Sequence, residues 1–260
     1  MNSHFYVILP SDSSVGSYPN NTVARFVTKL PERIHLEGDY EMALAEIIYP
    51  HSWYNVDNTD GRYWLAVAQK HNADFAKILF PSGYYESGSA VAAALNRLLD
   101  SPSYNCEVQI YYNETMGRFS LTIDSAGPPV FAMSDDLQRY MGFDLSSFAV
   151  GRHSISTTAQ QTFDANRGLN LMYVYCDVAA HAIVGDTKAP LLRVCNVSGS
   201  HGDTVRHTYV QPHYVPVGRR DFDTIEIAIN NELGKPMPFE YGKSVITLHF
   251  RRRHGLLKTS

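Results

Sequence analysis

Near its C-terminal end the chain has two segments in which apolar and polar residues alternate, and this pattern limits the possible folds more than any other. In residues 224–230, TIEIAIN, every second residue from Ile225 is isoleucine, and residues 244–250, SVITLHF, alternate in the same way. A period of two places one face of a β-strand in a core and the other in solvent. The turn-rich NELGKPMPF lies between the two segments, so both read as strands of an antiparallel sheet.

Further strands are expected at both ends of the chain. Pro31 is expected to end one of them, and Pro212 and Pro216 exclude a continuous central strand over HTYVQPHYVPV. Strands recur without alternating helices, which favours an antiparallel sandwich or jelly roll. The segments that read as these further strands are residues 5–9, 22–30, 40–49, 171–178 and 190–197.

The middle of the chain has a different pattern. ESGSAVAAALNRLLD predicts a helix capped by Ser89, and a second short helix is expected between Ser134 and Gly142. Between them a hairpin is expected to turn at NETMG, and short strands precede the first helix. The fold class is therefore mainly β: a single jelly roll, an antiparallel β sandwich, with an inserted α+β unit. We expect residues 1–62 and 150–260 to form the jelly roll and residues 63–149 the insertion.

Enzyme motifs are missing from the sequence. Gly242-Lys243-Ser244 resembles the end of a phosphate-binding loop, but the required first glycine would fall at Met237. There is no GxGxxG, HExxH, CxxC or GxSxG motif. We therefore expect no enzymatic activity and no cofactor.

Histidine is abundant, which raises the possibility of a metal site. The densest group is His201, Asp203, His207 and His213. A metal-binding strand would place two histidines at i and i+2 so that both point the same way, and this group lacks that spacing. We interpret these residues as polar side chains beside a turn and expect no metal.

Cysteine content and charge limit the setting of the protein. Three cysteines are an odd and scattered set, which favours a reducing compartment. The apolar run at residues 5–9 is too short for an export signal, and no stretch approaches the length of a membrane span. The first 60 residues carry a net charge of −5 and residues 151–260 a net charge of +4.

Two groups of residues are candidates for contact with partners. Three consecutive arginines near the C-terminus can neutralise a few phosphates without sequence specificity. Aromatic residues in turns can anchor a protein interface, because tyrosine and tryptophan are enriched there. The candidate interaction residues are Arg251, Arg252, Arg253, Trp53, Tyr54, Tyr84 and Tyr85.

The order of several phrases resembles one family. The chain is similar to the penton-type minor capsid proteins of Polinton/Maverick elements and related virophage-like viruses. The similarity covers most of the chain outside residues 63–150. The phrases that carry it are FYVILPSDSS, NTVARFVTKLPERIHLEGDYEMALAEIIYPHSWYNV, LMYVYCDV, VGDTKAPLLRV, FDTIEIAINNELGKPMPFEYGK and VITLHFRRR.

This resemblance implies a structural role in a virion. It implies a homopentamer at the fivefold vertices of an icosahedral capsid, contacts with double-jelly-roll major capsid proteins, and no catalysis. By the same analogy the insertion projects outward from the capsid wall. The basic C-terminal end would face either the packaged DNA or the acidic flank of a neighbouring copy.

Two other functions stay open at this point. A stand-alone jelly roll could bind a glycan or a receptor, with Tyr84 and Tyr85 stacking on sugars. The lack of an export signal disfavours a secreted lectin, and a glycan array would test this alternative. A metal-dependent jelly-roll enzyme is the third alternative, and metal analysis of the purified protein would test it.

Overall fold

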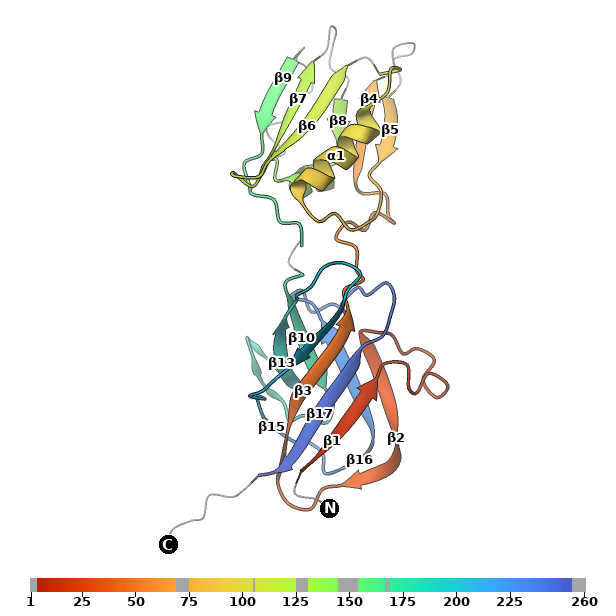
Figure 1. Cartoon of the computed structure of the whole chain (residues 1–260), viewed down its shortest axis with the longest axis vertical. Helices are drawn as coiled ribbons and strands as arrows, with labels where there is room; N and C mark the ends of the chain where they lie inside the picture. Colours follow the sequence, from red (N-terminus) through yellow and green to blue (C-terminus); the bar gives the residue numbers. More distant parts are fainter. Residues whose placement is uncertain are drawn as a thin grey trace. The chain divides into compact units, whose positions relative to one another are not determined.

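The computed structural model describes residues 4–68, 75–104, 106–124, 131–144, 154–166 and 169–253. It divides into two compact units (Figure 1). Unit 1 comprises Met1–Trp53 and Gly168–Ser260, and unit 2 comprises Tyr54–Arg167. The chain thus leaves and re-enters unit 1 at residues 53/54 and 167/168, whereas the sequence pattern suggested residues 62/63 and 149/150.

Unit 1 is a sandwich of two antiparallel sheets (Figure 1). A short hairpin, β11 (Ala182–Val184) with β12 (Thr187–Ala189), stands apart from both sheets. The first sheet has the order β1 (His4–Pro10), β17 (Val245–Arg252), β3 (Tyr40–Pro50) and β14 (Thr204–Thr208), with β15 (Val215–Pro216) also on β3. The second has the order β13 (Leu191–Asn196), β10 (Leu171–Cys176), β16 (Asp221–Asn230) and β2 (Arg25–His35).

Prolines shape the strands of unit 1 in two ways. The segment with Pro212 and Pro216 is divided, as predicted, into β14 and β15, which pair with opposite ends of β3. The expectation that Pro31 ends a strand is wrong, because β2 continues to His35. β2 lies at a sheet edge, and its register with β16 shifts between Phe222 and Thr224. An edge strand with a bulge tolerates proline because the missing amide hydrogen is not needed there.

The two sheets of unit 1 enclose one apolar core. Ile225, Ile227 and Ile229 of β16 are completely buried, as their alternation predicted. They pack with residues of β17 such as Leu248 and Phe250 from the opposite sheet. Burying each of these side chains contributes about 1.5–3 kcal/mol to folding. The fold prediction is confirmed: the chain is mainly β, a jelly roll with an inserted α+β unit.

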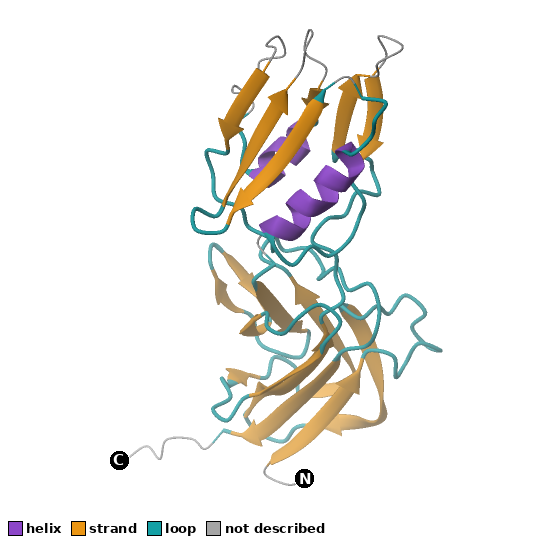
Figure 2. Cartoon of the chain, turned by 45° about the horizontal axis from the view of Figure 1, so that its top comes forward, coloured by secondary structure: helices purple, strands orange, loops and turns teal. Residues whose placement is uncertain are grey.

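Unit 2 has its own core, formed by two small sheets and two helices (Figure 2). Within the described residues, neither helix is long and apolar enough to cross a membrane. One sheet has the order β5 (Phe75–Leu79), β4 (Trp64–Ala68) and β8 (Phe131–Met133), and the other β6 (Glu107–Asn113), β7 (Arg118–Asp124) and β9 (Ser154–Thr158). The helices are α1 (Gly88–Leu99) and α2 (Asp135–Met141).

The helix ends of unit 2 test the capping predictions. For α2 the prediction is confirmed: the Ser134 hydroxyl accepts from a backbone amide of the first turn, and Gly142 ends the helix at φ 81°. For α1 the predicted cap is wrong, because Ser87 and not Ser89 accepts from the backbone N–H of Ala90. The Ser89 hydroxyl donates instead to Glu114, 2.6 Å away.

Candidate assembly surfaces

β1 is an edge strand whose outer side is open. It pairs with β17, and the bond from Ser11 N to Ser244 O sets which of its residues face that partner. In antiparallel pairing, alternate residues turn their backbone groups away from the partner strand. The amide and carbonyl groups of Tyr6 and Ile8 therefore lie along the outer edge. Their side chains are 59% and 64% exposed, which is unusual for large apolar groups on a strand edge.

The neighbouring edge strand, β2, is closed by the loop that precedes it. The Asn21 side chain accepts from Val27 N and donates to Val27 O, both at 2.9 Å. The Ser14 hydroxyl accepts from Lys29 N, and Thr22 exchanges bonds with Arg25. Side chains thus occupy the positions that a further strand would take on β2. Such protection is the usual way in which sheet edges avoid unwanted pairing, and no described residue provides it for β1 over Tyr6 and Ile8.

A groove of about 610 Å³ runs between β1 and β2. Its lining is mostly apolar and includes Val7, Ile8, Leu30 and Pro31. Lys29 and Glu32 of β2 also line it, and both are exposed. We call this groove and the outer edge of β1 the β1 flank.

The opposite flank of unit 1 also exposes apolar side chains. Ile183 on the β11–β12 hairpin is 79% exposed, and Val194 on β13 and Val210 after β14 are exposed as well. The hairpin turns through Gly185 and Asp186, and its second strand carries Lys188. We call these residues the hairpin flank. A two-stranded hairpin is marginally stable by itself, so its exposed isoleucine indicates a contact surface.

The two flanks lie at opposite edges of the sandwich. β1 and β2 line one groove, and each is the last strand of its sheet. β13 and β14 are the last strands at the other end, where the Arg193 guanidinium of β13 lies over the Tyr209 ring that follows β14, 3.7 Å from its centroid. Figure 1 shows β1 and β2 on one side of unit 1 and β10 and β13 on the other.

The candidate arginines lie at the end of β17 and are not equally available. The Arg251 Nε donates to Glu41 at 2.6 Å, and its guanidinium lies 3.4 Å from the centroid of the Tyr214 ring. Arg252 and Arg253 are exposed. Among the described residues no ion pair is recorded for Arg252 or Arg253. Two of the three arginines therefore present their charge to solvent.

A histidine on the outer face of β17 joins β1 to this basic end. The Tyr6 ring stacks on His249 with centroids 4.4 Å apart, and the Tyr214 hydroxyl lies 2.7 Å from His249 Nδ1. Burial lowers the pKa of His249, and nearby His4 and Arg251 lower it further. His249 therefore favours the neutral form, in which it can pack flat against Tyr6.

The candidate tryptophan is a core residue and not a surface anchor. Trp53 is 1% exposed, and its ring stacks on His51 with centroids 4.0 Å apart. Phe239 and Tyr49 pack around it within unit 1. This placement corrects its assignment as an interaction residue, because no partner can reach a buried ring.

The candidate tyrosines lie in unit 2. Tyr54 is 40% exposed, and Tyr84 and Tyr85 are half-buried. The Tyr85 ring stacks on Phe80 at 4.8 Å, and its hydroxyl donates to Pro81 O at 3.0 Å. Tyr85 therefore holds its own turn together. The candidate arginines belong to the other unit, unit 1.

The histidine-rich segment forms a hydrogen-bonded turn. The Asp203 carboxylate accepts from Ser200 N at 2.8 Å, and His207 Nε2 lies 3.1 Å from the Ser198 hydroxyl. In the described part of the chain no group of three or more His, Cys, Asp or Glu residues is arranged to hold a metal ion. All three cysteines are free thiols, and burial raises the pKa of Cys176 to about 12.

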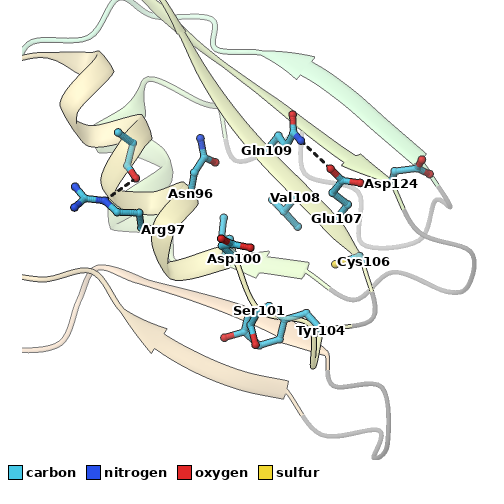
Figure 3. A pocket seen from close by; sticks show the side chains of 12 residues that line it. Asn96, Arg97, Asp100, Ser101, Tyr104, Cys106, Glu107, Val108, Gln109 and Asp124 are labelled. Atoms are coloured by element: carbon cyan, nitrogen blue, oxygen red, sulfur yellow. Dashed lines mark hydrogen bonds between the residues drawn. The ribbon is translucent and has the colours of Figure 1, made fainter.

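A second hollow of about 690 Å³ lies in unit 2, between α1 and the start of β6 (Figure 3). The Asn96 side chain crosses from α1 to β6, donating to Ile110 O and accepting from Ile110 N. Glu107 accepts from Gln109, and Arg97 donates to a carbonyl of its own helix. Asn96 thus joins α1 to β6, and the other polar groups bond within their own element, so we assign the hollow no chemistry.

Sequence reasoning missed the residues that form the two flanks. One signal was present: residues 5–9 are apolar at every position. A strand with only one buried face needs apolar residues only at alternate positions. Tyr6 and Ile8 are therefore two apolar residues more than one buried face requires. For Ile183 the signal was weaker: Gly185 and Asp186 favour a turn, but the strands on either side of them have only three residues each.

Comparisons with known proteins bear on the fold of the whole chain. No protein-family model matches the chain, and no curated protein matches it at a significant level. Among solved structures, the crystal structure of the selenomethionine-labelled mavirus penton protein matches with a TM-score of 0.51 and 10% identity, covering 96% of this chain and 98% of that one. The cryo-EM structure of the Sputnik virophage also matches, with a TM-score of 0.47 and 10% identity over 97% of this chain and 98% of that one.

Proposed function

We propose that this chain is a penton-type minor capsid protein, a structural subunit without catalytic activity. In this proposal five copies form a ring at the fivefold vertex of an icosahedral capsid. Unit 1 forms the wall and contacts double-jelly-roll major capsid proteins, and unit 2 projects outward. The source, a Polinton/Maverick element or a virophage-like virus, is part of the same proposal.

The observation that carries the proposal is the pair of apolar flanks at opposite edges of unit 1. A closed ring needs two different surfaces on each copy, one for each neighbour. The β1 flank and the hairpin flank supply two such surfaces. The fold similarity to the mavirus penton protein, which includes both units, supports the same function.

Light scattering on the purified protein at low and high salt tests self-assembly. We expect a closed species of five times the 29.2 kDa chain, and we expect it to persist at high salt because apolar contacts are not screened. A monomer at every concentration and salt would overturn the proposed ring. Co-sedimentation of the ring with capsid shells that lack their vertices then tests contact with the major capsid protein.

Contact between the basic end and packaged DNA is the weaker part of the proposal. With Arg251 already paired to Glu41, Arg252 and Arg253 are left to meet phosphates. Two phosphate contacts predict that the logarithm of DNA affinity falls with the logarithm of salt with a slope of about −2. Replacing Arg252 and Arg253 by serine removes that slope if DNA is the partner. An unchanged slope would show that the arginines do not contact DNA.

The glycan-binding alternative gains no support from the turn at Tyr84 and Tyr85. Sugar binding needs an exposed aromatic face, and one face of Tyr85 is covered by Phe80. We therefore keep the capsid role as the proposed function.

A further inference from the structure

We propose that the β11–β12 hairpin of one copy docks on the β1 flank of the next copy, with Ile183 entering the groove between β1 and β2. This inference rests on the proposed self-assembly and identifies the two surfaces that meet. The partner is a second copy of this chain, because each copy carries both surfaces at opposite edges of its sandwich.

The apolar side chains on the two surfaces are complementary: several line the groove, and one projects from the hairpin. The groove is lined by Val7, Ile8, Leu30 and Pro31, and the hairpin presents the exposed side chain of Ile183. Side chains that fill a well-packed, desolvated pocket near the centre of an interface carry most of the binding energy. Docking would remove Ile8 and Ile183 from water together.

The charges beside the apolar residues are also complementary. The groove carries Lys29 and Glu32, and the hairpin carries Asp186 and Lys188. All four side chains are exposed, and within the described residues none has a recorded ion pair. Docking can bring Asp186 to Lys29 and Lys188 to Glu32, because the two charges on each surface are close in sequence: Asp186 lies in the hairpin turn and Lys188 two residues on in β12, and Lys29 and Glu32 lie three residues apart in β2. Such pairs set the register of an interface more than its strength.

The open edge of β1 supplies hydrogen-bond partners for the hairpin backbone. The backbone groups of Tyr6 and Ile8 face outward, whereas Asn21 and Ser14 occupy the corresponding positions on β2. Both hairpin strands pair only with each other among the described strands, so each has an outer edge of its own. An extended segment added to an open sheet edge is a recurrent mode of protein recognition. The blocked edge of β2 directs the hairpin to β1.

Disruption of either surface tests the inference. We expect Ile183→Asp and Ile8→Asp each to weaken association by about 100-fold or more, so that both variants are monomeric where the unmodified chain is a ring. Leu233→Asp is the matched control, because Leu233 is 78% exposed and belongs to neither flank. Circular dichroism verifies that all three variants fold. If Ile183→Asp forms the same ring as the unmodified chain, the inference is overturned while the proposed ring stands.

Cross-linking tests which surfaces meet. With cysteines at both positions, Ile8→Cys with Ile183→Cys, oxidation is expected to give a ladder of covalent oligomers. All of these variants also carry Cys106→Ser, because Cys106 is a half-buried free thiol whereas Cys176 and Cys195 are buried. Equal amounts of the two single variants are then expected to give dimers only, because each chain has one reactive position. Dimers from Ile8→Cys alone would show that groove meets groove, which overturns the inference. Absence of any cross-link in a ring-forming double variant overturns it as well.

Reversed charges give a third readout that needs no apolar change. Lys29→Glu with Glu32→Lys is expected to weaken the ring, as is Asp186→Lys with Lys188→Asp. All four substitutions together restore the pairs and are expected to restore assembly. If the four-fold variant is no better than either two-fold variant, the proposed pairing of charges is wrong. If the unmodified chain is itself a monomer, the proposed function fails and this inference fails with it.

Discussion

Asn58 joins two segments of unit 2, and its replacement by alanine should selectively destabilise that unit. The side chain is buried and accepts from Tyr63 N at 2.8 Å. Its amide nitrogen donates to Tyr63 O at 2.8 Å and to Phe80 O at 2.6 Å. Its own backbone N–H donates to the Ser82 hydroxyl. One side chain thus holds the start of β4 against the end of β5.

The expected loss of stability follows from the groups left without a partner. Tyr63 O keeps a bond from Phe80 N at 2.9 Å. Tyr63 N–H and Phe80 O lose their recorded partner in Asn58→Ala. Each buried backbone group left unsatisfied costs about 1–3 kcal/mol, so the free energy of unfolding should fall by about 2–6 kcal/mol. At a typical urea slope of about 2 kcal/mol per molar, the midpoint should fall by about 1–3 M.

The two tryptophans of the chain allow each unit to be followed separately. Trp53 lies in unit 1 and Trp64 in unit 2. In a Trp53→Phe background the remaining Trp64 reports on unit 2, and in a Trp64→Phe background the remaining Trp53 reports on unit 1. Urea unfolding of Asn58→Ala is measured in each background and compared with the same background without Asn58→Ala. We expect the Trp64 transition to move and the Trp53 transition to stay. Asn20→Ala, at an exposed asparagine, should change neither by more than about 0.5 kcal/mol.

Two results would refute this reasoning. A loss below about 1 kcal/mol in the Trp64 transition would mean that water or rearrangement replaces the bonds of Asn58. An equal shift of both transitions would mean that the two cores do not unfold separately. Asn58→Asp adds a check: its carboxylate would face carbonyl oxygens, which raises its pKa in the folded state. Stability of that variant should therefore rise as the pH falls through the raised pKa.

Three further predictions concern single groups. The Asp221 carboxylate, 2.7 Å from His35 Nδ1, raises the pKa of His35. The pairing therefore stabilises the fold at low pH, and this stabilisation is lost as the pH rises through the raised pKa. NMR titration of Asp221→Asn should show the pKa of His35 returning to its ordinary value. Burial raises the pKa of Cys176 to about 12, whereas Cys106 is only half-buried. A thiol reagent at pH 8 should therefore modify Cys106 in the folded protein and Cys176 only in urea. Fast labelling of Cys176 in the folded protein would contradict this. Gly142 has φ 81°, and an added Cβ would lie 2.5 Å from a backbone oxygen. Gly142→Ala should therefore lower the free energy of unfolding of unit 2 by about 2 kcal/mol or more, as measured by urea unfolding. A loss below about 0.5 kcal/mol would count against this geometry.

Features set by neighbouring residues could be predicted from the sequence. α2 was located because Ser134 and Gly142 cap and end it by chemistry within one helical turn. The alternation around Ile225 located β16 for a similar reason. The limit appears at α1, where two serines lie at the start of the same helix, Ser87 just before it and Ser89 in its first turn. Ser87 caps it, while Ser89 is drawn to Glu114, a residue far along the chain.

Features set by distant residues could not be predicted. Trp53 follows a proline and a histidine, and its burial depends on Phe239 from the other end of unit 1. The edge of β1 at Ile8 is open because β17 pairs with only one side of the strand, and no local pattern states which edge stays open. The candidate arginines were located correctly at a strand end, but the pairing of Arg251 with Glu41 required the register of β17 on β3.

The two chain segments that connect unit 2 to unit 1 lie side by side, and this affects how the protein can change in evolution. Asn55, on the outgoing segment, donates to Ala165 O on the returning segment at 2.8 Å. An insertion whose two ends lie one hydrogen bond apart can be exchanged as a cassette for any domain with adjacent ends. The first and last strands of unit 1 are neighbours as well, since His4 of β1 pairs with Arg251 of β17. The exchange breaks no strand of the sandwich, so unit 2 can diversify while the two flanks of unit 1 stay under separate selection.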